Sequence, residues 1–395
     1  MVRAERSFAS RAGVTLPAIM LTRRAWLSTT GATGIVFASK TALNADIEEL
    51  ARFGGTPQNF ATPLAYFDRL ITPSSVFFVR SHFGPPALDH ARKLVIDGLV
   101  ETPLTLSVDQ VRRLPAVEVT AVLQCAGNGR ALHLPRVPGI QWTHGAMGQA
   151  VWKGVRLRDL LAKARVKPEA AHVQLAGADL PPKPQTPAFL RSIPLARALS
   201  PETIVAYEMN GAPLSLAHGA PLRLVVPGWA GDHWVKWLTH LRVQREEAEG
   251  FFMQTAYRMP ASVVEPGAPV PPAEMRSLTT FPVKSLIVTP TEGERRPPGT
   301  QLVKGVAFSG EAPIEAVEVS SDDGKTWHRA KLEGEPGVGR WQIFSISLAG
   351  GAGGPMSAVA RALERGGRMQ PERAAWNPSG YFWNGWHRVA WEVAA

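Results

Sequence analysis

The residues most able to do chemistry lie in one short stretch, Thr120–Arg130. It contains Cys125, the only cysteine among 395 residues, and it ends in the cation Arg130. Apolar residues precede the cysteine and Gly127-Asn128-Gly129 follow it, so we expect a strand that delivers a thiol to a turn. A lone cysteine on an apolar strand is most often a small core residue, whereas an accessible thiolate is a nucleophile or a metal ligand. The residues alone leave both roles open.

Several common catalytic patterns are absent from the sequence. The chain has no Cys-x-x-Cys, no His-Glu-x-x-His and no Cys-x-x-Cys-His, which argues against a zinc site or a covalently attached haem. It also lacks the glycine-rich loops that bind nucleotides and the Gly-x-Ser-x-Gly of many serine hydrolases. A cysteine hydrolase needs a positioned histidine, and His82 or His218 could serve.

Charge and composition restrict the partners of the chain. The formal net charge is +10, but half of this excess falls within residues 1–40. The remainder has no basic run and no basic-aromatic ladder, so we expect no nucleic-acid partner. A mild positive charge suits an anionic substrate or an acidic partner. With 45% hydrophobic and 19% charged residues the chain is globular, and its length predicts two domains.

The N-terminus has the pattern of an export signal. Thr22–Leu27 contains a twin arginine, a weakly apolar run follows, and Leu43–Ala45 offers a cleavage site that ends in a small residue. We therefore predict a signal over residues 1–45, with residues 1–19 as an over-extended start because Met20 precedes the motif; the alternative is an ordinary basic helix. The apolar run is too short to cross a bilayer, so we expect a periplasmic protein without a membrane span.

The hydrophobic pattern of residues 46–260 predicts a domain of strands and short helices, an α+β fold. The expected strands are the segment before Cys125, Ser75–His82, Lys93–Gly98, Ala171–Gly177, Ile204–Met209 and Leu222–Val226, and Trp234–Leu241 is a strand or a short helix. The expected helices are Leu106–Leu114 with a Ser107 cap, Gly154–Lys163 and Ile193–Leu199.

A proline-rich stretch separates this domain from a second one. Five prolines between Pro260 and Pro272 predict a stiff, extended connector over residues 261–279. In residues 280–395 short strands alternate with turns, and Asp322–Lys325 has the composition of a hairpin turn, which is typical of an immunoglobulin-like β-sandwich. The expected strands are Pro282–Val288, Gln301–Phe308, Ala316–Ser321 and Trp341–Leu348.

Several segments, in the same order, resemble the sulfite oxidase family of molybdenum enzymes. The resemblance runs from about residue 55 to the C-terminus. It implies a molybdopterin-binding domain followed by an immunoglobulin-like dimerisation domain. The matching strings are the cysteine loop Leu123–Arg130, the early strand Phe77–His82, the pterin-binding core Ala206–Leu214 with His218–Gly228 and Val235–Trp237, and the end of the second domain, Trp376–Val389.

The resemblance implies a molybdenum–molybdopterin cofactor with Cys125 as its protein thiolate ligand. Sulfur ligands suit a metal that changes its oxidation state. The pterin carries a phosphate and many hydrogen-bonding edges, so its pocket needs cations and backbone donors. The residues implied to hold it are His82, His218, Arg223 and Lys236, with backbone or secondary contacts from Phe78, Ser81, Asp179 and Val235.

The resemblance also implies a substrate pocket for sulfite. Arginines suit this dianion because a guanidinium stays charged and binds oxyanions in a fork. Arg80, Arg130 and Arg388 match the family's substrate positions, and they would meet only if the second domain packs over the metal. Tyr257 matches the active-site tyrosine, whose hydroxyl would hydrogen-bond the substrate. Trp142 could form a pocket wall or pack in the core.

The implied activity is oxidation of sulfite to sulfate, as in bacterial sulfite dehydrogenases without a haem domain. Electrons would leave to a separate acceptor such as a c-type cytochrome, and the chain would form a homodimer or hold a stable cytochrome subunit. Two departures from animal members are Ala256, in place of an aspartate before the tyrosine, and Gly129 before Arg130.

Two other functions are compatible with the sequence. One is a periplasmic molybdenum-dependent reductase of sulfoxides such as methionine sulfoxide. Such an enzyme would not need three arginines, so their presence argues against it. The other is a non-catalytic exported binding protein that uses its β-sandwich for partner contact, which would contain no molybdenum.

Overall fold

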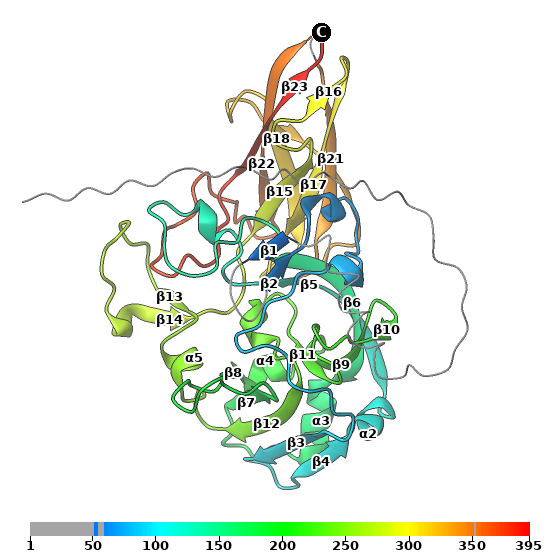
Figure 1. Ribbon diagram of the computed structural model, residues 1–395, viewed down its shortest axis with the longest axis vertical. Coiled ribbons are helices and arrows are strands. Elements are labelled where there is room, and N and C mark those ends of the chain that lie inside the picture. Colours follow the sequence, from blue (N-terminus) through cyan, green and yellow to red (C-terminus); the bar gives the residue numbers. More distant parts are fainter. Residues whose placement is uncertain (1–50, 54–58, 351–352) are drawn as a thin grey trace, which may run out of the picture. The chain divides into compact units, whose positions relative to one another are not determined.

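The computed structural model describes residues 51–53, 59–350 and 353–395 (Figure 1). The predicted export signal at residues 1–45 therefore lies outside the described residues. The described chain contains two five-stranded sheets with short helices, followed by the two sheets of a β-sandwich. This arrangement confirms the predicted α+β fold with a C-terminal sandwich. No helix in the described ranges has the length and hydropathy needed to cross a membrane.

The first sheet presents the cysteine. Its strands have the order β10-β9-β6-β5, and β11 pairs with β9. The last residues of β5 are buried on both faces, which explains their continuous apolar run, and Cys125 is the first residue after β5 ends. The strands are β5 (Ala116–Gln124), β6 (Met147–Arg156), β9 (Ile204–Met209), β10 (Ala212–Pro213) and β11 (Arg223–Val225).

The second sheet has the order β4-β3-β12-β7-β8. β12 runs parallel to β3 and antiparallel to β7, so the sheet is mixed. In β3, Leu94 and Ile96 are buried while Lys93 is exposed, the alternation of a strand with one face on the core. The strands are β3 (Lys93–Gly98), β4 (Leu104–Ser107), β7 (His172–Gly177), β8 (Leu190–Pro194) and β12 (Leu238–Gln244).

Short helices complete this domain. The predicted Ser107 cap is confirmed: Ser107 Oγ accepts from Gln110 N at 3.2 Å, and Gln110 Oε1 accepts from Ser107 N at 2.7 Å, a capping box. The α-helices are α2 (Val108–Arg112), α3 (Leu157–Ala164), α4 (Leu195–Ala198) and α5 (Phe251–Gln254). The 3₁₀ helices are Leu64–Phe67, Ser74–Val76, Arg130–Leu132, Gly231–His233 and Pro272–Glu274, and β1 (Ala51–Phe53) pairs with β2 (Asn59–Ala61).

The C-terminal sandwich consists of the sheets β15-β17-β21-β20 and β16-β23-β22-β18-β19. Apolar side chains of both sheets share one core, and the predicted Asp322–Lys325 turn lies between β18 and β19. The strands are β15 (Lys284–Thr289), β16 (Arg295–Arg296), β17 (Gln301–Phe308), β18 (Ile314–Ser320), β19 (His328–Arg329), β20 (Lys331–Glu333), β21 (Gln342–Leu348), β22 (Gly354–Glu364) and β23 (His387–Val393).

Two predicted elements are wrong. Residues 75–82 form no strand: Ser74–Val76 is a 3₁₀ helix, Val79 makes an isolated bridge with Phe60, and residues 78–82 line a pocket. The proline-rich stretch is not an extended connector. β13 (Arg258–Pro260) pairs antiparallel with β14 (Met275–Ser277), so the prolines lie in the loop between them. Gly267, at φ +85°, lies within a turn of this loop in which Ala268 N donates to Glu265 O at 3.0 Å.

One hydrophobic cluster is shared by the two predicted domains. Val122, Ala126 and Met147, around the cysteine, pack in the same cluster as Phe281 and Phe382. The segment that carries the thiol is therefore supported on one side by residues C-terminal to the proline-rich loop.

Candidate active site

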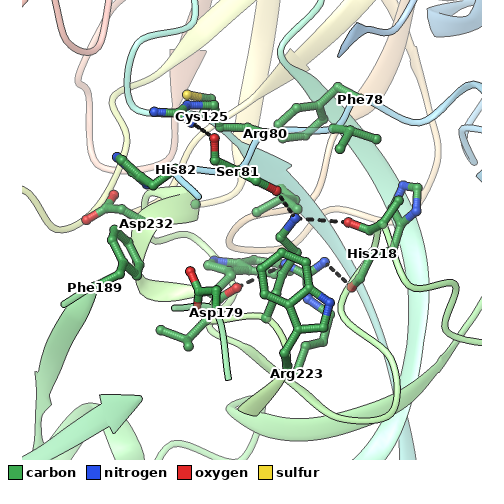
Figure 2. A pocket seen from close by; sticks show the side chains of 18 of the residues that line it. Phe78, Arg80, Ser81, His82, Cys125, Asp179, Phe189, His218, Arg223 and Asp232 are labelled. Carbon is green, nitrogen blue, oxygen red and sulfur yellow. Dashed lines mark hydrogen bonds between the residues drawn. The ribbon is translucent and has the colours of Figure 1, made fainter. Parts of the chain in front are cut away.

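A pocket lies where β5 ends and encloses about 750 Å³, part of it open to solvent (Figure 2). All but two of the predicted site residues line it, which brings together positions far apart in the sequence. They are Phe78, Arg80, Ser81, His82, Cys125, Asp179, His218, Arg223, Val235, Lys236 and Tyr257. The pocket also contains residues that the sequence did not indicate: Val79, Leu123, Ala126, Phe189, Ala217, Gly231, Asp232, Trp234 and Trp237.

The Cys125 turn is held by the segment that leads into β6. Cys125 N donates to Ala146 O at 2.9 Å, and Asn128 N donates to Cys125 O at 2.9 Å. The buried side chain of Asn128 accepts from Ala146 N at 3.0 Å. The half-buried thiol is thus placed at the pocket by a turn whose backbone groups are satisfied within the protein.

Cations gather at one end of the pocket. Arg223 is buried and donates to the carbonyls of His218, at 2.9 Å, and Trp234, at 3.1 Å. Lys236 Nζ donates to Ser81 Oγ at 2.7 Å and to Ala217 O at 3.0 Å. Burial lowers the pKa of Arg223 to about 9 and holds the pKa of Lys236 well below its usual value, so a bound anion at this end would stabilise the charged forms of both groups.

Polar atoms without protein partners also face this region. His218 Nδ1 is bonded to Ser215 Oγ at 2.8 Å, while His218 Nε2 is buried and has no protein partner. Arg223 Nε is unpartnered as well. Burial, followed by the charges of Arg223 and Lys236, lowers the pKa of His218 to about 3, so its ring is neutral. Buried polar atoms of this kind usually have a partner, which a bound ligand would supply.

At the other side of the pocket, aromatic rings surround His82. The Tyr257 hydroxyl lies 3.0 Å from His82 Nε2, and the Phe189 ring stacks on the imidazole with centroids 4.7 Å apart. Burial, then the charge of Arg80, lowers the pKa of His82 to about 2, so the histidine is neutral. Burial raises the pKa of Tyr257, so its hydroxyl keeps its proton. Tyr257 also adopts φ +55°, which is uncommon for a residue with a side chain.

Arg80 brings a guanidinium to the pocket. It donates to the carbonyl of the neighbouring Ser81, and its NH1 lies 3.5 Å from Asn59 Oδ1. In Figure 2, Arg80 and Cys125 lie close together at one end of the pocket, with Arg223 and Asp179 at the other.

Asp232 is an ionisable residue of the pocket that sequence reasoning missed. Its Oδ2 lies 2.7 Å from Arg191 NH2, and both side chains are almost fully buried. Arg191 also donates to Phe252 O and lies over the Tyr257 ring, 5.4 Å from its centroid. Burial outweighs the charge of Arg191 and raises the pKa of Asp232 to about 6. Its position beside Gly231, between two strings of the resemblance, was a signal that could have identified it.

Arg130 is not among the pocket-lining residues. Its buried guanidinium donates to Ser379 O at 2.9 Å and to Ile140 O at 3.1 Å. Glycines make room for it: a Cβ on Gly127 or Gly139 would lie 2.7 Å from a guanidinium nitrogen. Arg130 therefore ties the cysteine turn to the second domain, and its predicted place among pocket arginines is wrong.

Arg388 is not in the pocket either. It lies on β23 with its side chain 43% exposed, paired with Asp323 at 3.0 Å and Glu372 at 3.1 Å. Residues alternate along β23, so Val389 points into the sandwich core and Arg388 points outward. The predicted meeting of three arginines is therefore wrong. Trp142 is fully buried in the core of the first domain.

The residues present fit a molybdopterin group. Buried cations and unpartnered donors at the His218–Arg223 end suit a phosphate and hydrogen-bonding heterocycle edges, and a thiol lies in the same pocket. Gly219, at φ +106°, brings the backbone close to Lys236, where a Cβ would lie 3.0 Å from the lysine Cβ. No three His, Cys, Asp or Glu side chains of the described residues come together as a metal site.

Comparisons with known proteins agree with this geometry. Residues 82–252 match the family model described as "oxidoreductase molybdopterin binding domain", and residues 275–394 match "Mo-co oxidoreductase dimerisation domain". The chain is 34% identical over 365 residues to a sulfite oxidase of Arabidopsis thaliana, covering 85% of this chain and 91% of that protein.

An animal relative and a solved structure extend the comparison. The mitochondrial sulfite oxidase of Homo sapiens is 38% identical over 338 residues, covering 82% of this chain but only 62% of that longer protein. The crystal structure of the sulfane dehydrogenase SoxCD from Paracoccus pantotrophus matches with a TM-score of 0.75 and 28% identity, over 91% of this chain and 92% of that one.

Proposed function

The chain belongs to the sulfite oxidase family of molybdopterin-binding oxidoreductases, and we propose that it oxidises sulfite to sulfate and passes the electrons to a separate acceptor such as a c-type cytochrome. The observation that carries the proposal is the pocket that joins the thiol of Cys125 to Arg80 and to the buried cations Arg223 and Lys236.

The cofactor implied by the family would be held by residues already described. Cys125 would be the protein ligand of the molybdenum, and Arg223, Lys236 and His218 would contact the pterin and its phosphate. When bound, this cofactor supplies the two-electron redox chemistry, while the protein supplies binding, orientation and charge.

The side chains around the thiol have distinct tasks in this proposal. Arg80 binds the oxyanion, because a guanidinium offers two charge-assisted hydrogen bonds. The ring of His82 stays neutral and orients the Tyr257 hydroxyl toward the substrate. Asp232, whose pKa burial raises to about 6, can hold or release a proton near neutral pH when water is consumed and sulfate is formed.

A second candidate is oxidation of sulfane sulfur, the activity named for the structural relative SoxCD. The specific observation in its favour is the position of the arginines: Arg388 is paired on the surface and Arg130 donates to carbonyls, which leaves Arg80 as the guanidinium beside the thiol. A pocket with less positive charge suits a substrate with less negative charge than sulfite.

The same observation removes an argument against a sulfoxide reductase. The sequence disfavours that function because three arginines would be unnecessary for a neutral sulfoxide. Since two of the three lie outside the pocket, the choice rests on the family relationship, which favours oxidation.

The test has two stages. The first measures molybdenum in the purified full-length protein: a ratio near one atom per chain is expected, and its absence would instead support a binding protein. The second mixes loaded enzyme with sulfite, an alkyl persulfide or methionine sulfoxide. Reduction of ferricyanide or cytochrome c by sulfite supports the first proposal. Reduction by persulfide alone supports the second, and turnover of methionine sulfoxide with a reduced dye would contradict both.

We also propose that the protein works in the periplasm as a homodimer. The twin-arginine sequence supports export, and the match of residues 275–394 to a dimerisation domain supports self-association. Cell fractionation and sedimentation of the purified protein test the two statements separately.

A further inference from the structure

A second group of buried nitrogens lies at the junction between the cysteine turn and the β-sandwich. Lys284, the first residue of β15, is 1% exposed, and its Nζ lies 5.3 Å from the centroid of the Trp383 ring. The Trp383 side chain in turn packs against Gly129 of the cysteine turn, where a Cβ would lie 2.7 Å from Trp383 Cβ.

Histidines from both domains surround Lys284. The rings of His144 and His387 are perpendicular, with centroids 4.6 Å apart, and His144 lies 5.5 Å from Trp383. Burial lowers the pKa of His144 and His387, and the charge of Lys284 lowers both further.

These nitrogens lack the partners that buried polar groups need. Lys284 Nζ, His144 Nδ1 and His133 Nε2 are buried and have no protein hydrogen-bond partner. His387 Nδ1 accepts from Ile287 N at 3.2 Å, so in the neutral ring Nε2 carries the proton and can donate. The Lys284 ammonium therefore has no protein acceptor in the described part of the chain, and ring nitrogens beside it are unpaired as well.

No acidic side chain neutralises the group. Burial alone lowers the pKa of Lys284 to about 7, with no contribution from an Asp or Glu of the described residues. A buried ammonium without a counter-charge costs several kcal/mol, and proteins usually avoid this by pairing the charge. A bound anion would supply both the missing acceptor and the missing charge.

We propose that Lys284, His144 and His387 bind a small inorganic anion at the junction between the two domains. The anion accepts hydrogen bonds from the ammonium and from imidazole N–H groups, next to the Trp383 ring that packs on Gly129. This site is separate from the Cys125 pocket, none of whose lining residues belongs to it, so the inference does not depend on the proposed activity.

Bromide is the direct probe, because its anomalous scattering locates it. Crystals of the full-length protein soaked in sodium bromide should show a bromide at hydrogen-bond distance from Lys284 Nζ. In solution, the thermal unfolding midpoint should rise by roughly 2–4 °C when gluconate is replaced by bromide or sulfate at constant ionic strength. A shift with sulfate alone would define the site as one for oxyanions and would equally support the proposal.

Lys284→Met should abolish both the bromide peak and the midpoint shift. Lys304→Met is the matched control: Lys304 lies on the neighbouring strand β17 and donates to Asp68 O at 2.7 Å, so its removal should leave the shift intact. If Lys284→Met does not fold, His144→Phe takes its place. An empty bromide map around Lys284 together with no midpoint shift from bromide or sulfate, or an equal midpoint shift in Lys284→Met, would overturn the proposal.

Discussion

At the scale of single residues, the role of each arginine follows from its acceptors. Arg80 lines the pocket, Arg130 donates to the carbonyls of Ser379 and Ile140, and Arg388 is paired with two surface acids. All three match positions in family motifs, but only Arg80 can present a guanidinium to a substrate next to Cys125.

This difference predicts the kinetics of a matched pair of variants. Arg80→Met should raise KM for the anionic substrate about tenfold or more, since one charge-assisted hydrogen bond contributes roughly 1.5–3 kcal/mol. Arg388→Met should leave KM within about twofold, because it removes only exposed ion pairs. Steady-state kinetics of both variants decide the matter. A similar increase of KM in Arg388→Met would return that residue to the site.

Cys125→Ser tests the ligand assignment. A serine hydroxyl does not ionise near neutral pH and is a poor substitute for a thiolate. We expect the variant to fold, because Cys125 N and O keep their hydrogen bonds, and to lose turnover and bound molybdenum. Metal analysis and thermal unfolding measure the two effects, and a fully active variant would show that the thiol is not the ligand.

Lys284 predicts a dependence of stability on pH. The pKa of Lys284 falls from 10.5 to about 7 on folding. Between these pH values the unfolded chain holds a proton on Lys284 that the folded chain does not. The contribution of Lys284 to the free energy of unfolding of the wild-type protein therefore rises with pH. Lys284→Met should therefore be more stable than wild type by about 4 kcal/mol near and below pH 7. This gain should shrink as the pH approaches 10.5. Urea unfolding in halide-free buffer measures it, and a gain that does not change with pH would contradict the burial of an unpaired ammonium.

At the scale of elements, the turn from Cys125 to Arg130 is shaped by glycines. Gly127, Gly139 and Gly380 all lie against the Arg130 side chain, and Gly380 belongs to the second domain. The conformation of the turn thus depends on the absence of side chains at positions remote in the sequence.

Gly380→Ala should destabilise the protein by about 2–4 kcal/mol, because a Cβ there would lie 2.6 Å from Val137 Cγ2 and 2.8 Å from Arg130 Cγ. Gly211→Ala is the control for backbone strain alone. Gly211 has φ +77°, similar to φ +60° at Gly380, but a Cβ there would meet no atom within 4 Å beyond its chain neighbours. It should cost only about 1 kcal/mol. Chemical denaturation compares the two, and equal losses would mean that contact with Arg130 does not matter.

Sequence patterns predicted elements well where local chemistry decides them. Ser107 and its capping box, the strand before Cys125 and the Asp322–Lys325 turn all depend on neighbouring residues. The prediction of a strand over residues 75–82 is wrong because Phe78 and Val79 line a pocket and Phe77 packs in the core, so the apolar run does not mark a strand of a sheet.

For the site residues too, sequence motifs predicted some positions correctly and tertiary contacts decided the others. Most residues of the matched strings lie in the pocket, but Arg130 and Arg388 do not, because Arg130 donates to backbone carbonyls and the alternation of β23 turns Arg388 outward. Asp232 was missed because its significance comes from Arg191, which lies 41 positions earlier in the chain and shares no motif with it.

At the scale of the whole molecule, the two family models divide a chain whose core is continuous across their boundary. Phe67, Val122 and Met147 pack in one cluster with Phe281, Trp341 and Phe382. Gln149 adds a hydrogen bond of 2.7 Å from Trp341 N to its side chain.

We therefore expect one cooperative unfolding transition for the full chain, with equal calorimetric and van't Hoff enthalpies. A fragment of residues 59–274 would expose the apolar side chains of this cluster and should aggregate or lack a cooperative transition. Two separate transitions in the full chain, or a well-folded fragment, would show that the domains are independent.

The hydrogen bonds of the cysteine turn have a consequence for local opening. Asn128 N donates to Cys125 O within the turn, while Phe382 N, from the second domain, donates to Ala126 O. Exchange of the Phe382 amide proton with solvent requires the turn to move away from Phe382, whereas the Asn128 amide reports opening within the turn. The exchange rate of the Phe382 amide should then report how often the two domains separate. The backbone beside the thiol thus provides a measurable probe of the opening of the whole molecule.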